Sequence, residues 1–219
     1  METLNKTMED KLNEGRSYRN MVNFEVRESD DDEMIAEGYA TTFNESYELF
    51  SYDNWEGYRV HFMEQVDPDA FRETEMDDTI MQYNHEGRVF ARNRNKTLEL
   101  ESDEHGLRIR AKLGGTEIGR QLYEEIKGGY TDRMSFAFVV SDQHRVIETV
   151  DSRTIVTRHI TGIRKLYDVS AVSMPANDST TISARSWCDG VIAELEAERL
   201  SALEASRRKL ALKIKLTGG

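Results

Sequence analysis

The sequence predicts a β-rich α+β protein, a β-barrel or sandwich with a few helices around it and a long helix at its C-terminal end. Most of the chain consists of short runs in which apolar and polar residues alternate, as they do in strands with one buried face. One internal segment has the spacing and capping residues of a helix, and residues 187–219 are rich in leucine and in charges of both signs. This mixture favours a framework of strands.

A length of 219 residues is enough for one sizeable domain with appendages. Cys188 is the only cysteine, so the chain cannot form an intramolecular disulfide or a cysteine-based zinc site. The first residues contain no apolar run, which argues against a secretory signal. No window approaches the roughly 18 apolar residues of a membrane span. We therefore expect a soluble protein of a reducing, intracellular compartment.

The charge is strongly negative and unevenly distributed. The formal net charge is −12, and residues 187–219 hold six Lys or Arg and five Asp or Glu, so the remaining chain carries −13. An acidic body repels a phosphate backbone. We expect no direct nucleic-acid or membrane partner, and a basic protein or peptide fits this charge better.

The first part of the chain predicts a flexible arm followed by strands. Residues 1–20 are polar and lack a period. An aromatic and polar stretch over 44–57, also without a period, predicts a loop. Pro68 suits the first turn of a short helix with Asp67 as its cap. Alternation predicts strands over 22–28, 33–43 and 58–66.

The middle of the chain predicts a hairpin and the one internal helix. Four further strands are predicted over 79–84, 88–92, 97–101 and 107–113. The last two of them form a hairpin that turns at 103–106. Thr116 can cap the helix that follows, because Ile118, Leu122 and Ile126 share one face and Gly128-Gly129 ends it.

The last part of the chain predicts three strands and a long helix. The strands cover 134–140, 153–161 and 163–174, and Pro175 ends the last one. The helix over 187–219 is acidic in its first half and basic in its second, an order that complements the helix dipole. We therefore divide the chain into an arm (1–20), a main domain (21–186) and a helical tail (187–219).

Three polar residues interrupt this apolar pattern. Ser135 stands near the head of the apolar strand MSFAFVV, where a serine is usually structural. It lacks the glycine-flanked elbow of the α/β-hydrolases. His85 follows a predicted strand and precedes Gly87, a turn residue; no histidine pair has the spacing of a metal-binding helix, so we expect no metal.

Asp168 interrupts an apolar strand and shares a face with Leu166, Ser170 and Val172. Burying an unpaired carboxylate is costly, so Asp168 needs a partner. Spacing alone favours a salt bridge to Arg164 or Lys165. An imidazole would serve as well, and then the three residues would follow the logic of a catalytic triad: a hydroxyl nucleophile, a neutral histidine as base, and an anion that orients the ring.

The order of several motifs resembles the prohead maturation proteases of tailed bacteriophages, serine proteases related in fold to the herpesvirus assemblins. The resemblance covers about residues 22–185. It rests on an ordered set in which no single motif is specific: GYATTF, EQVDPDAF, Asn84-His85, TLELESDEHGLRIRAKL, GGYTDRMSFAFVV and DVSAVSMPA. Two positions depart from the usual pattern, with Asp69 in place of a glycine and Asp168 where glutamate is common.

The resemblance implies the fold and the site residues. The main domain would be a closed or nearly closed β-barrel surrounded by helices, as in the herpesvirus proteases. The nucleophile would be Ser135, the general base His85 and the acidic member Asp168. His159 competes for the third position, because the herpesvirus relatives have a histidine there. Backbone N–H groups would form an oxyanion hole, for which the turn around Ala176 and Asn177 is a candidate.

The resemblance also implies a function. The protein would be a serine endopeptidase without a cofactor, cleaving scaffold or major capsid protein segments, and itself, inside the immature capsid in the host cytoplasm. The herpesvirus relatives suggest a homodimer. Three other functions fit the same residues: a non-catalytic β-rich capsid-assembly or scaffold protein, an inactive protease homologue, and a hydrolase of small esters.

Overall fold

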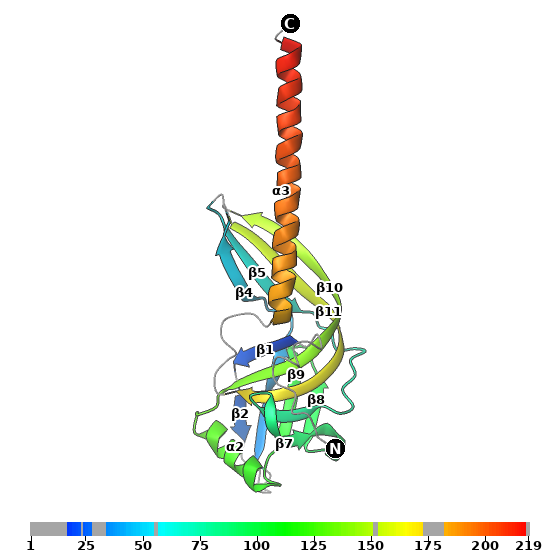
Figure 1. Cartoon of the computed structure of the whole chain (residues 1–219). Helices are drawn as coiled ribbons and strands as arrows, with labels where there is room; N and C mark the ends of the chain where they lie inside the picture. Colours follow the sequence, from blue (N-terminus) through cyan, green and yellow to red (C-terminus); the bar gives the residue numbers. More distant parts are fainter. Residues whose placement is uncertain are drawn as a thin grey trace, which may run out of the picture. The chain divides into compact units, whose positions relative to one another are not determined.

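The computed structural model describes residues 17–22, 24–27, 34–54, 57–150, 153–172 and 182–217 (Figure 1). The chain divides into two compact units, Met1–Thr181 and Ile182–Gly219. The first unit holds every strand and one α-helix, α2, within these ranges. The second consists of one long helix, α3 (Ile182–Thr217). The β-rich α+β class and the long C-terminal helix are therefore confirmed.

The strands form two sheets. The larger sheet has seven strands and follows the order β1-β10-β11-β5-β4, with β6 paired to β11 and β7 paired to β6. The smaller sheet follows the order β2-β3-β9-β8. The bounds in the larger sheet are β1 Ser17–Val22, β4 Tyr47–Asp53, β5 Arg59–Val66, β6 Ile80–Tyr83, β7 Glu86–Arg92, β10 Arg133–Val150 and β11 Arg153–Val172; in the smaller sheet they are β2 Phe24–Arg27, β3 Ile35–Thr42, β8 Leu98–Ser102 and β9 Gly106–Lys112.

The predicted closed or nearly closed barrel is wrong. Across the described strands neither sheet closes on itself, and β1 and β4 stand at the two ends of the main strand path. Figure 1 shows β10 and β11 running together as a long curved ribbon, with β4 and β5 along one end of it. Alternation within a strand reveals one buried face, but it carries no information on which distant strand completes the sheet.

The two central strands are longer than predicted. β10 has 18 residues and β11 has 20, so the two strands expected at 153–161 and 163–174 are one. Gly162 separates the two predicted runs, and it lies opposite Asp142 where the register shifts. A Cβ at Gly162 would lie 2.7 Å from the Ser141 hydroxyl. Glycine within a strand often marks such an irregularity, which bends the strand without ending it.

Three local predictions are also wrong. Residues 17–20, expected in the flexible arm, belong to β1, which pairs with β10. The expected loop at 44–57 contains β4, whose alternation is hidden by a register shift between Glu48 and Phe50. The expected helix at Pro68 is a series of turns, the first of which is closed by a hydrogen bond from Ala70 N–H to the Asp67 carbonyl (3.0 Å).

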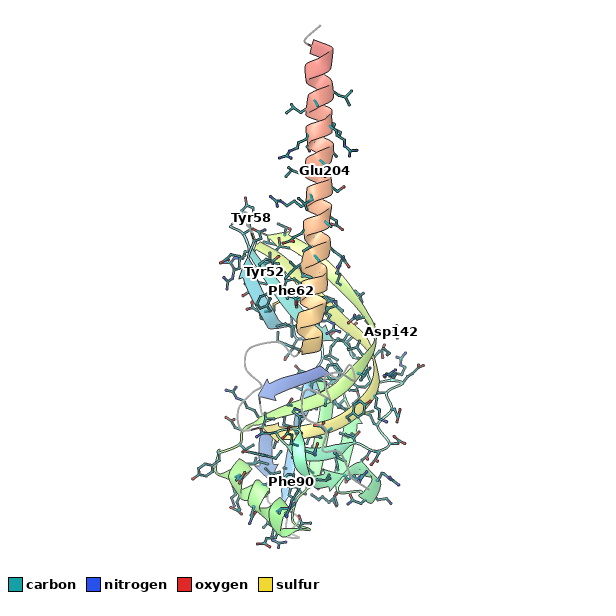
Figure 2. The ribbon with its side chains drawn as sticks, viewed as in Figure 1. Tyr52, Tyr58, Phe62, Phe90, Asp142 and Glu204 are labelled. Atoms are coloured by element: carbon teal, nitrogen blue, oxygen red, sulfur yellow. The ribbon has the colours of Figure 1, made fainter. Side chains whose placement is uncertain are left out.

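Aromatic rings stabilise the end of the larger sheet where β4 pairs with β5. Phe50 and Tyr52 of β4 stack with Phe62 of β5 at centroid distances of 6.4 and 6.3 Å. Figure 2 shows Tyr52 and Phe62 on these neighbouring strands. Phe62 is fully buried beneath these contacts.

The predicted hairpin and internal helix are confirmed. β8 and β9 pair, and Asp103 closes their turn by accepting hydrogen bonds from the N–H groups of His105 and Gly106 (2.8 and 2.9 Å). Helix α2 (Glu117–Lys127) is capped by Thr116, whose hydroxyl accepts from Gly119 N–H at 3.0 Å. Gly129 has φ +71°, the left-handed conformation that commonly follows a helix end.

We expect Thr116→Ala to lower the free energy of unfolding by about 1 kcal/mol, because the first turn of α2 loses its side-chain acceptor. Denaturant titration would measure the change. Thr116→Ser is the matched control, since it retains the hydroxyl and should stay close to the parent. Equal stability of the alanine and serine variants would contradict the capping role.

Candidate active site

Three buried polar side chains from separate elements form one chain of hydrogen bonds. Nε2 of His85 lies 2.6 Å from the Ser135 hydroxyl, and Nδ1 lies 2.6 Å from Oδ1 of Asp168. Ser135 is 0 % exposed, His85 3 % and Asp168 4 %. The structure thus brings together all three residues that the sequence singled out.

The pairing of β10 with β11 places the hydroxyl beside the carboxylate. Ser135 lies directly opposite Ser170, and Ala137 lies directly opposite Asp168. Side chains of paired residues point to the same face of a sheet, as do residues two apart on one strand. Ser135 and Asp168 therefore share a face of the sheet. The small side chain of Ala137 leaves space above the sheet on that face.

A tight turn brings the imidazole to this face. Asn84 and His85 connect β6 to β7, and both have positive φ, 51° and 60°. Two such residues between paired Tyr83 and Glu86 are the arrangement of a type I′ hairpin turn. Residues other than glycine adopt the left-handed conformation infrequently, although asparagine and histidine do so more often than most, and such conformations cluster at functional sites.

The turn is fastened to β11. β6 pairs with β11 in parallel, with Ile80 opposite Asp168. Asn84 N–H then donates to the Ala171 carbonyl at 3.0 Å. Because the same strand carries Asp168 and anchors the turn, the carboxylate and the imidazole hold a fixed relation to one another.

The carboxylate determines the tautomer of the ring. An ionised carboxylate can only accept hydrogen bonds, so Nδ1 of His85 carries the proton and donates it to Asp168. Nε2 is then an acceptor, and the Ser135 hydroxyl donates to it. A hydroxyl that donates to a neutral imidazole is prepared to lose its proton during nucleophilic attack.

The salt bridge that spacing favoured for Asp168 is absent. Lys165 donates to Glu75 instead, and this hydrogen bond raises the pKa of the Lys165 ammonium group. Asp168 contacts Nδ1 of His85 instead.

Sequence reasoning missed the role of Ser170. Its hydroxyl is fully buried and donates to Oδ1 of Asp168 at 2.6 Å, the same oxygen that accepts from His85. The signal was present in the sequence, because a hydroxyl two residues after the carboxylate lies on the same face of the strand. This hydrogen bond helps to hold the carboxylate of Asp168 in place.

His159 lies in a different environment. Its Nδ1 is 3.5 Å from Asp67 Oδ1, and its ring stacks on that of His144 with centroids 4.7 Å apart. The position behind the His85 ring is occupied by Asp168. The suggested oxyanion turn around Ala176 and Asn177 lies outside the described residues.

In the part of the chain that the structure describes, no group of three or more His, Cys, Asp or Glu is arranged to hold a metal ion. The described helices include none that is long and apolar enough to cross a membrane.

A serine, a histidine and an aspartate joined in this way define the class of serine hydrolases. A family model described as caudovirus prohead serine protease matches residues 22–190. The chain therefore belongs to the family of prohead serine proteases. Comparison with curated proteins gave no significant match, and neither did comparison with solved structures.

We expect Ser170→Ala to lower the free energy of unfolding by about 1 to 3 kcal/mol, because a buried, charged acceptor loses one donor. Thermal or denaturant unfolding would measure it. Ser141→Ala is the matched control, since Ser141 lies on β10 and is exposed. Equal effects of the two substitutions would contradict the assignment of Ser170 to Asp168.

Proposed function

We propose that the protein is a serine endopeptidase of capsid maturation that uses Ser135 as nucleophile, His85 as general base and Asp168 as the orienting anion. The observation that carries the proposal is the unbroken chain of two 2.6 Å hydrogen bonds among them. Membership of the prohead serine protease family supports it.

The geometry supports acyl transfer in two steps. The Ser135 oxygen attacks a peptide carbonyl as its proton passes to Nε2 of His85, and Asp168 stabilises the imidazolium that forms. The imidazolium then gives its proton to the leaving amine, and the peptide C–N bond breaks. In the second step water, deprotonated by His85, hydrolyses the acyl-enzyme and restores the Ser135 hydroxyl.

The substrates that fit the family are scaffold and capsid protein segments inside the prohead, together with the protease itself. The charge of the chain supports a protein substrate, since residues 1–186 carry a net charge of −13. Basic segments are attracted to such a body, whereas a phosphate backbone is repelled.

We infer a separate role for the C-terminal helix. α3 begins at Ile182, and residues 187–219 carry a net charge of only +1. Its described side chains include exposed leucines at positions 200, 203, 210 and 212. A long helix with little net charge and exposed leucines suits docking to helical scaffold segments.

We expect Ser135→Ala to abolish scaffold cleavage and self-processing, with a loss of at least about 10³-fold in rate. His85→Asn should do the same, because asparagine tolerates the left-handed turn but is no base. Gel analysis of purified chain and of proheads would measure both, with circular dichroism as the control for folding. Cleavage at the parental rate in Ser135→Ala would favour the non-catalytic assembly role instead.

Deletion of residues 187–219 should reduce incorporation of the protease into proheads, because the proposed scaffold contact is lost. The amount of protease per purified prohead would measure it. The matched control is the full-length Ser135→Ala chain, which should be incorporated normally. Unchanged incorporation of the deletion variant would exclude docking by the tail.

A further inference from the structure

An open pocket of about 500 Å³ lies between the β6–β7 hairpin and helix α2. It is separate from the triad side chains, none of which lines it. The hairpin contributes one wall and the helix the other. Its lining residues are Tyr83, Asn84, Glu86, Gly87, Arg88, Phe90, Ile118, Gln121, Leu122 and Glu125.

The base of the pocket is apolar and its edge is polar. Leu122 is 2 % exposed, and Tyr83 and Phe90 pack against the hydrophobic core; Phe90 is labelled on β7 in Figure 2. The exposed lining residues are Glu86, Arg88, Gln121 and Glu125, together with Asn84 and Gly87. An apolar base with a few polar groups around it is the usual composition of a ligand site.

The pocket adjoins the proposed general base along the chain. Asn84 and Glu86 are the residues on either side of His85, and both line the pocket. Consecutive Cα atoms are only about 3.8 Å apart, so the turn that presents the imidazole to Ser135 is also a wall of the pocket. One turn thus contributes both the imidazole that contacts Ser135 and two lining residues of the pocket.

We propose that this pocket is a substrate subsite that takes a bulky apolar side chain close to the scissile bond. The occupant is a side chain of the cleaved protein segment, because the turn that carries the proposed base also forms one wall of the pocket. The Gln121 side chain borders the opening from α2, and the polar edge is available to the backbone of the bound segment. This inference rests on the proposed peptidase function.

The test fills the pocket without touching the triad. Gln121→Trp places a large ring at the opening from an exposed position on α2. Glu124→Trp, three residues on, is the matched control, because Glu124 is exposed and does not line the pocket. The substrates are peptides from a cleaved scaffold segment, varied at one position at a time between Leu or Phe and Ala.

Two readouts separate the subsite from the catalytic chemistry. For the parent we expect kcat/KM to be at least about tenfold higher with Leu or Phe than with Ala at one fixed position of the peptide. Apolar pockets discriminate between large and small apolar side chains by this factor or more. Gln121→Trp should remove this preference, whereas Glu124→Trp should retain it. Covalent labelling of Ser135 by a small fluorophosphonate should proceed at the parental rate in both variants.

The outcomes are distinguishable. Parental preference in Gln121→Trp, with labelling intact, would overturn the subsite and leave the peptidase function standing. A parent chain that neither reacts with the fluorophosphonate nor cleaves any peptide would overturn the proposed function, and the subsite with it.

Discussion

The carboxylate of Asp168 is buried, and a buried charge must be satisfied by hydrogen bonds in the folded chain. Two donors meet at one of its oxygens, the imidazole of His85 and the hydroxyl of Ser170. The first fixes the tautomer of the ring and thereby turns Nε2 toward Ser135. The need to satisfy one anion thus orders the whole hydrogen-bond chain.

Strand pairing supplies the precision of this arrangement. β11 carries the acid, pairs with the strand that carries the hydroxyl, and pairs on its other edge with the strand that leads into the His85 turn. The same strand therefore positions all three side chains of the candidate site. A site built on ladder hydrogen bonds varies less in geometry than one built on loops.

Much of the fold could be predicted from sequence because strands and caps leave local signals. The β8–β9 hairpin and the Thr116 cap depend on residues that are close in the chain. The two-sheet architecture could not be predicted, since it depends on pairings such as β5 with β11, whose partners are far apart in sequence. A register shift hid β4, and Gly162 made one strand resemble two.

The site residues were predicted from a resemblance, because a lone serine, histidine or aspartate is a weak signal. Sequence spacing even favoured Arg164 or Lys165 as the partner of Asp168, whereas in the fold Lys165 donates to Glu75. The Asn84-His85 turn did leave a local signal, since asparagine is common where φ is positive. The two-residue spacing placed Ser170 on the same face as Asp168, but strand periodicity alone does not show that the two side chains form a hydrogen bond.

Hydrogen bonding along both edges of β11 also affects how readily one copy of the protease could be cleaved by another. An extended peptide is recognised through free backbone groups at an edge, and at Asp168 one edge faces Ala137 while the other faces Ile80. Digestion of that segment would first require the sheet to open. The segment of β11 around Asp168 is thus shielded by its neighbouring strands from recognition as an extended peptide.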